Sequence, residues 1–134
     1  MSTYLLDTNI WIYFLKGQFD LISKFKAIGP ENIGISEISI AELKYGAYNS
    51  QKVDYNLKVI ESLIQQTTTY SILSGLDIYA SEKARLKKAG MIIDDFDLLI
   101  GSTSIASNLI LVTRNTKHFS RIHNIQLEDW IELT

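Results

Sequence analysis

The chain has 134 residues and a mass of 15.2 kDa. Hydrophobic residues make up 46% of it and charged residues 21%, so it has the size and composition of one globular domain. It contains no cysteine, which excludes disulfides, thiolate nucleophiles and iron–sulfur clusters, and its two histidines are too few for a three-histidine zinc site. A net charge of −2 and a pI near 5.6 exclude nucleic-acid binding through bulk positive charge.

The N-terminal apolar run at 4–6 is interrupted at once by Asp7, and no basic cluster precedes it. We therefore expect no signal or transit peptide. Apolar stretches stay well short of the roughly 18 residues of a membrane span, so we expect a cytoplasmic protein without a membrane partner. One proline, Pro30, and scattered glycines provide no linker, and residues 1–134 are predicted to form a single domain.

Short apolar runs alternate with amphipathic segments along the chain, which predicts strands alternating with helices. In chain order we expect a strand at 4–6, helices at 10–16 and 21–28, a strand at 33–35, helices ending at 47 and spanning 53–64, a strand at 67–72, helices at 76–89 and 94–107, a strand at 109–113, a short helix at 115–119 and a strand within 125–131. This alternation is typical of the α/β class, here a sandwich with a central, mainly parallel sheet covered on both faces.

Two acidic residues admit a functional interpretation: Asp7, directly after the first predicted strand at the edge where α/β sheets gather ligands, and Glu42, on an apolar face of the helix after the second strand. Asp7 is explained equally well as a helix N-cap, although Thr8 and Asn9 are also good capping residues. For Glu42 the start of the helix decides: with Ser39 as N-cap, Glu42 completes a capping box. If the helix starts near Ser36 instead, the Glu42 carboxylate points inward and needs a partner, and we favour this second interpretation slightly.

Three further acidic residues, Asp94, Asp95 and Asp97, open the helix predicted at 94–107. Complementing the helix dipole is sufficient explanation for Asp94 or Asp95 alone. Asp97 shares a helix row with Gly101, whose position inside a helix costs about 1 kcal/mol relative to alanine and predicts close approach by another backbone. We therefore expect Asp97 to point into a packed region as a buried carboxylate.

Carboxylates near strand ends, without cysteine and with little histidine, indicate a site for a hard cation such as Mg²⁺ or Mn²⁺. A cation would offset their mutual repulsion, activate water and clamp a phosphodiester oxygen. Thr113 and Asn115 follow the strand predicted at 109–113, on the side of Asp7; they are either turn and capping residues or groups that orient the site. The basic residues near 83–88 and 114–121 are either a solvated face or positions that hold an anionic backbone.

Four segments resemble, in order, the motifs of PIN-domain ribonucleases: LLDTN at 5–9, SIAEL at 39–43, DDFDLLI at 94–100 and LVTRNTKHF at 111–119. Their order and spacing, with LEDW at 127–130, are similar to the VapC toxins of bacterial toxin–antitoxin pairs over almost the whole chain. The resemblance implies a PIN-like α/β/α sandwich forming a single PIN domain over 1–134. It also implies an endoribonuclease, a hydrolase that cleaves RNA such as tRNA or rRNA with Mg²⁺, for which Mn²⁺ substitutes.

By motif match, the resemblance implies Asp7, Glu42 and Asp97 as the catalytic, metal-binding acids. Residues expected around them are Thr8, Asn9, Asp95, Thr113 and Asn115. The family also implies a homodimer and inhibition by a cognate VapB-like antitoxin. Candidate antitoxin contacts, equally explained as core or dimer residues, are Trp11, Tyr13, Phe14, Tyr45 and Tyr48. Asn115 stands where many family members have aspartate, which bears on whether a second metal ion binds.

Two other classes remain open beside the nuclease. A non-catalytic PIN-like module would bind a protein partner without metal affinity or RNA turnover. A phosphotransfer receiver domain is also α/β with acidic strand ends, but it normally has an acidic pair after its first strand, where this chain has Asp7 followed by Thr8 and Asn9. Metal-dependent RNA cleavage that is lost on Asp7→Asn or Asp97→Asn substitution would distinguish the nuclease from both.

Overall fold

The computed structural model describes residues 2–131, whose strands form one five-stranded sheet. The strands are β1 (Tyr4–Leu6), β2 (Ile33–Ser36), β3 (Thr68–Tyr70), β4 (Ile110–Val112) and β5 (Gln126–Glu128). Their order across the sheet is β3-β2-β1-β4-β5, and every neighbouring pair is parallel. The prediction of a parallel α/β sheet is therefore confirmed, and the carboxyl ends of all these strands lie along one edge.

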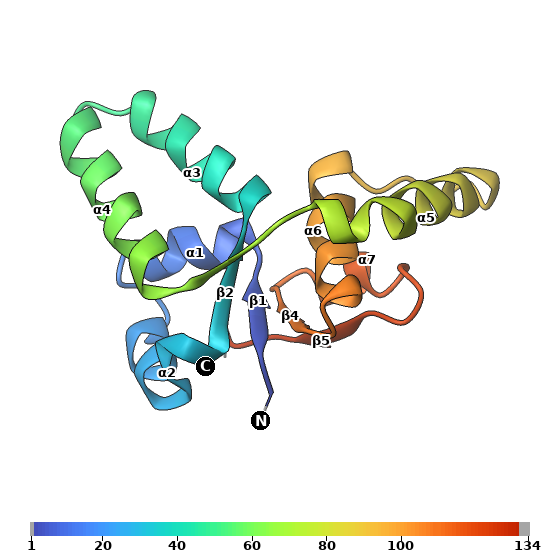
Figure 1. Ribbon diagram of the computed structural model, residues 1–134, viewed down its shortest axis with the longest axis horizontal. Helices are drawn as coiled ribbons and strands as arrows, with labels where there is room; N and C mark the ends of the chain where they lie inside the picture. Colours follow the sequence, from blue (N-terminus) through green and yellow to red (C-terminus); the bar gives the residue numbers. More distant parts are fainter. Residues whose placement is uncertain (1, 132–134) are drawn as a thin grey trace.

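Helices cover both faces of the sheet. They are α1 (Thr8–Leu15), α2 (Leu21–Ile28), α3 (Glu37–Tyr48), α4 (Val53–Gln66), α5 (Leu76–Lys88), α6 (Asp95–Ala106), α7 (Thr116–Phe119) and the short 3-10 helices η1 (Pro30–Asn32) and η2 (Leu73–Gly75). Helices α1 to α4 lie on one side of the sheet, and α5, α6 and α7 lie on the other (Figure 1). Over residues 2–131, no helix has the length and apolar character needed to cross a membrane.

The sheet separates two apolar cores. Successive residues of a strand point to opposite faces, so Leu6 packs with Trp11 in one core while Leu5 packs with Leu98 in the other. These four side chains are almost completely buried, and each contributes about 1.5–3 kcal/mol of transfer free energy. Burial on both faces holds the central strand β1, and therefore Asp7 at its end, in a rigid position.

Among the element boundaries that differ from the predicted ones, those of α1 and β3 have clear local reasons. Helix α1 begins at Thr8, two residues earlier than expected, because the Asp7 carboxylate caps it. Strand β3 is limited to Thr68–Tyr70 instead of 67–72. The Thr67 hydroxyl donates to the Leu63 carbonyl at the end of α4, and the Ile72 N–H donates to the Glu37 carboxylate, so both flanking residues are held outside the ladder.

The expectation of a backbone close to Gly101 is wrong. A Cβ at Gly101 would lie 2.8 Å from the Ile122 Cδ1 atom and 3.3 Å from that of Ile125, so side chains, not a main chain, occupy the space beside it. The close backbone approach occurs on the same helix at Ser102, whose carbonyl carbon would lie 2.9 Å from a Cβ at Gly75. Helix α6 is thus wedged between η2 and the segment after α7.

Candidate active site

Asp7 lies at the carboxyl end of β1 and is 7% exposed. Its Oδ1 accepts hydrogen bonds from the N–H groups of Asn9 (2.8 Å) and Ile10 (3.4 Å), and its Oδ2 accepts one from the Thr113 hydroxyl (2.6 Å). Burial raises the pKa of Asp7, and these three hydrogen bonds partly offset that rise. The two interpretations of Asp7 are therefore compatible: it caps α1 with one oxygen and faces β4 with the other.

Glu42 does not take part in a capping box, because the N-cap of α3 is Ser36, whose hydroxyl accepts from the Ile38 N–H at 3.1 Å. The half-buried Glu42 carboxylate instead accepts a hydrogen bond from the Thr8 hydroxyl at 2.7 Å. The Thr8 and Ser39 hydroxyl oxygens are 2.8 Å apart. Since Thr8 gives its single hydrogen to Glu42, Ser39 is the donor in that contact, and the chain Ser39–Thr8–Glu42 joins α3 to α1.

Asp97 lies in the first turn of α6, which Asp94 caps by accepting from the Phe96 N–H. Its side chain is 41% exposed, so the expectation of a carboxylate buried in a packed region is wrong. Partial burial and the negative charges of Asp7, Asp94 and Glu42 together raise the pKa of Asp97 to about 6. The imidazole of His118, with Nε2 3.7 Å from Oδ2 of Asp97, acts in the opposite direction.

Three elements therefore bring Asp7, Glu42 and Asp97 to one edge of the sheet, where their charges act on one another. Within residues 2–131, no three Asp, Glu or His side chains are gathered closely enough to bind one metal ion as they are arranged. The donors themselves are of the kind that a hard divalent cation prefers, carboxylate oxygens only, and such an ion would relieve the repulsion that raises the pKa of Asp97.

Of the other predicted site residues, Thr113, Asn9 and Asn115 lie beside Asp7, whereas Asp95 does not. Thr113 is fully buried and links the site, since its hydroxyl donates to Asp7 and accepts from the Asn115 N–H at 3.1 Å. Asn9 and Asn115 line a cavity of about 240 Å³ together with Asp7, Thr113, Tyr13 and Arg114. Asp95 points elsewhere: its carboxylate accepts from the Tyr79 hydroxyl and the Lys83 ammonium, each at 2.8 Å, on α5.

Two neighbours of the acids were not predicted as site residues. Ser39 was considered only as a cap, and its bond to Thr8 joins residues 31 positions apart, which no local pattern reveals. His118 was included in the basic segment and in the motif at 111–119 but was given no role, and it lies three residues after Asn115 on the short helix α7. The sequence signals for its position are the motif at 111–119 and the short helix predicted at 115–119 after the strand that ends at Thr113.

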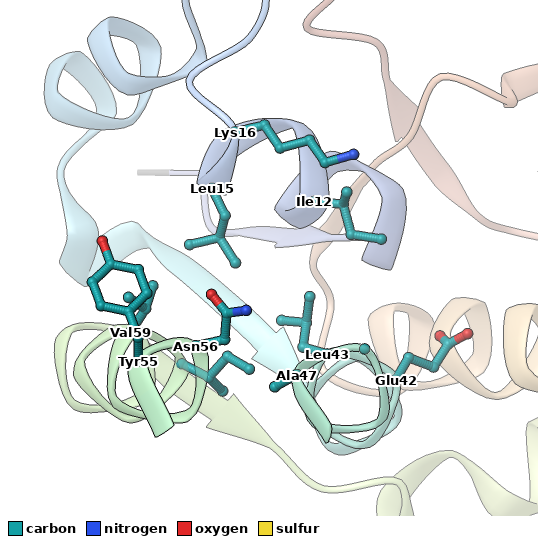
Figure 2. Close-up of a pocket in the computed structure, with 11 residues that line it drawn as sticks. Ile12, Leu15, Lys16, Glu42, Leu43, Ala47, Tyr55, Asn56 and Val59 are labelled. Carbon is teal, nitrogen blue, oxygen red and sulfur yellow. The ribbon is translucent and has the colours of Figure 1, made fainter. Parts of the chain in front are cut away.

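An apolar groove of about 480 Å³ lies beside the acids, between α1, α3 and α4. Figure 2 shows Glu42 at one end of this groove, with its carboxylate directed away from Tyr55 and Val59. Trp11, expected as a possible antitoxin contact, is fully buried in the core and offers no surface to a partner. Tyr45 and Tyr48 on α3 are largely exposed.

Residues 4–125 match the PIN domain, and the chain belongs to this family. Ribonuclease VapC2 of Rickettsia felis is 36% identical over 130 residues, covering 95% of this chain and 97% of the relative. The tRNA(fMet)-specific endonuclease VapC of Shigella flexneri is 30% identical over 131 residues, covering 97% and 99%. The crystal structure of VapBC2 from Rickettsia felis bound to a promoter DNA fragment contains a chain with a TM-score of 0.87 and 34% identity, covering 96% of this chain and 98% of that one.

Within the PIN-domain family, the chain is therefore one of the VapC ribonuclease toxins of VapBC toxin–antitoxin systems. This confirms the resemblance read from the four motifs, and the PIN-like fold with it. The alternative of a phosphotransfer receiver domain is wrong, because neither the family nor the solved structures are of that class.

Proposed function

We propose that this chain is a Mg²⁺-dependent endoribonuclease toxin that acts in the cytoplasm and hydrolyses phosphodiester bonds of RNA with Asp7, Glu42 and Asp97. The observation that carries the proposal is the convergence of these carboxylates from β1, α3 and α6 on one sheet edge, where the charges of Asp7 and Glu42 raise the pKa of Asp97. Such a cluster costs stability unless a cation or a proton is bound.

The three acids differ in how tightly the fold holds them. Asp7 is fixed by three hydrogen bonds and Glu42 by the Thr8 hydroxyl, so both would hold Mg²⁺ or Mn²⁺ through their remaining lone pairs. When bound, the ion would lower the pKa of a coordinated water and neutralise charge on the phosphate. Asp97 is held by fewer contacts and is half-exposed, so its carboxylate is the one best placed to accept a proton from the attacking water.

Substrate and partners follow from relatives. Since one relative is named as a tRNA(fMet)-specific endonuclease, we expect a folded RNA such as tRNA to be the substrate. The chain would act as a homodimer and be inhibited by a VapB-like antitoxin. An apolar antitoxin segment fits the groove between α1, α3 and α4, where Glu42 lies at one end and would be covered.

The test uses the purified chain and a mixture of tRNAs, with Mg²⁺ or with EDTA. We expect cleavage only with Mg²⁺, and a loss of at least about 100-fold in Asp7→Asn and Asp97→Asn, because a positioned general base contributes about 100-fold or more and an amide replaces neither a base nor a charged metal ligand. Asp95→Asn is the matched control on the same helix, since its carboxylate is paired with Lys83.

Cleavage that is equal in wild type and in the Asp97→Asn variant would contradict the assignment of the acids. Calorimetry with Mn²⁺ gives a second measurement: a catalytic site binds the ion, and Asp97→Asn weakens that binding. Antitoxin binding without metal affinity or RNA turnover would instead identify a non-catalytic protein-binding module.

A further inference from the structure

The loop between α1 and α2 has an unusual backbone. Gly17, Phe19 and Asp20 have φ angles of 68°, 58° and 54°. Glycine adopts this left-handed region without cost, whereas for a residue with a side chain it costs roughly 1–2 kcal/mol. Phe19 is also 40% exposed, so burial in a core does not account for its presence at this position.

The Phe19 ring instead connects two residues that flank the acidic site. It packs edge-on against Tyr13 of α1, with ring centroids 5.1 Å apart and planes at 84°. The guanidinium of Arg114 also lies over the Phe19 ring, with its Cζ 5.5 Å from the ring centroid. Arg114 directly follows Thr113, the residue that donates to Asp7. We refer to Tyr13, Phe19 and Arg114 as the aromatic–arginine stack.

Both ends of this stack line the cavity beside Asp7. Tyr13 and Arg114 form its walls together with Asn9, Thr113 and Asn115, and Arg114 is the cationic residue among the lining groups. Within residues 2–131, Arg114 forms no ion pair with a carboxylate. The stack therefore holds the guanidinium over the Phe19 ring, and no carboxylate of the described residues takes up its N–H donors, which remain available to a ligand.

The charge of the site defines which ligand such a cation would take. An RNA strand that approaches Asp7, Glu42 and Asp97 meets negative charge in a protein whose net charge is −2. Local cations, not the overall charge, must therefore hold the phosphates near the cleaved bond. A planar guanidinium matches two phosphate oxygens, which a point charge does not.

We propose that Arg114 binds the non-bridging oxygens of an RNA phosphate in the cavity beside Asp7, and that Phe19 is a positioning residue that holds the guanidinium there. The proposal rests on the proposed function, because it takes RNA as the substrate. It adds a specific contact outside the three acids. Asn9 and Asn115 offer further hydrogen-bond donors to the same strand.

The experiment compares Arg114→Gln, Phe19→Leu and Phe19→Tyr with Lys117→Gln. Lys117 is an exposed cation three residues further along, outside the cavity lining, so its variant removes the same charge. Steady-state cleavage of tRNA with Mg²⁺ separates KM from kcat, and fluorescence anisotropy in EDTA measures RNA binding at several salt concentrations. Thermal unfolding reports whether each variant is folded.

For Arg114→Gln we expect KM to rise about tenfold with kcat within about twofold, and the slope of log affinity against log salt to fall by about 0.7, as for the loss of one phosphate contact. Phe19→Leu should raise KM about threefold, and Phe19→Tyr, which keeps the ring, should restore the wild-type value. Lys117→Gln should change either quantity by less than about twofold.

An Arg114→Gln variant whose KM and salt slope equal those of Lys117→Gln would overturn the proposal. A Phe19→Leu variant that binds RNA like wild type would overturn the positioning role of the ring. If the wild-type chain does not cleave RNA, the proposed function fails separately. The anisotropy measurement still decides the inference in that case, because a selective loss of affinity in Arg114→Gln supports it and equal affinities refute it.

Discussion

Replacing Asp97 with asparagine is expected to stabilise the metal-free protein while it abolishes activity. The carboxylate has a pKa of about 6 because it is partly buried and faces the charges of Asp7, Asp94 and Glu42. Asparagine has nearly the same shape and carries no charge. The substitution therefore removes the repulsion and leaves the packing of α6 unchanged.

The direction of the pH dependence follows from the raised pKa. Below about pH 4, Asp97 is protonated in both the folded and the unfolded chain, and its contribution to stability is fully present. As the pH rises through about 6, the folded protein must release a proton that it binds more tightly than the unfolded chain does, and that stability is lost. The difference in free energy of unfolding between the Asp97→Asn variant and the wild type should therefore grow between about pH 4 and pH 6.

The expected difference in free energy of unfolding between Asp97→Asn and the wild type is modest. A rise from 3.8 to about 6 corresponds to about 3 kcal/mol if it is transmitted fully to stability. Because the side chain is 41% exposed, solvent screening reduces this to about 1 kcal/mol. For a chain of this size, that amount corresponds to a Tm increase of about 4 °C at neutral pH.

The assay is thermal unfolding in EDTA and in Mg²⁺, at acidic and at neutral pH. Mg²⁺ should raise the Tm of the wild type at neutral pH and have a smaller effect on Asp97→Asn. Asp95→Asn is the control: the Lys83 ammonium lowers the pKa of Asp95, so this variant should gain no stability and should keep the Mg²⁺ response. A variant Asp97→Asn that is less stable than wild type in EDTA at neutral pH, or whose difference from wild type is the same at acidic pH, would refute the electrostatic argument.

Substitutions at three further positions test the contacts that stabilise the fold and the site. Thr113→Val removes the 2.6 Å hydrogen bond to buried Asp7 and should lower the free energy of unfolding, measured in urea, by about 2 kcal/mol. Because that hydrogen bond lowers the pKa of Asp7, its loss should also move the pH optimum of cleavage upward, and an unchanged optimum would argue against this link. Glu82→Gln should cost about 2 kcal/mol, because the buried Glu82 accepts two hydrogen bonds from Arg85, which lower its pKa, and this stabilisation should fade in wild type as the pH falls below about 4. Asn108, exposed at the end of α6 with φ of 54°, should tolerate glycine and lose about 1 kcal/mol on replacement by alanine; equal Tm values for the two variants would contradict the backbone argument.

Most of the fold could be predicted from local patterns. Apolar runs such as 109–113 and helix faces such as 53–64 depend on neighbours within a few residues, and the corresponding elements form close to where they were expected. The predicted edge position of Asp7 and Thr113 follows from parallel strands that end on one side. Where two local signals were nearly equal, only a slight preference was possible: Ser36 and Ser39 are both suitable caps, and the favoured start near Ser36 is the one that the structure shows.

Contacts between residues far apart in the sequence were harder to predict from the sequence. Gly101 indicated close packing, but not that Ile122 and Ile125 fill the space. Trp11 could have been a surface aromatic or a core residue, and its ring is enclosed by Phe14 and Phe25. A hydrophobic pattern indicates that a side chain is buried, but it does not identify the side chains that cover it.

The amino-acid order alone was sufficient to establish a parallel α/β domain of the PIN family with acidic residues at strand ends, because periodicity and motif spacing are properties of neighbouring residues. The strand order β3-β2-β1-β4-β5 was settled by folding, since it depends on which apolar faces can be buried against each other. That order places β1 between β2 and β4, and so sets Asp7 between the helix that carries Glu42 and the hydroxyl of Thr113. The same tertiary packing brings Phe19 under Arg114, a contact between residues 95 positions apart, because it depends on how α1 and β4 lie relative to each other and not on neighbouring residues.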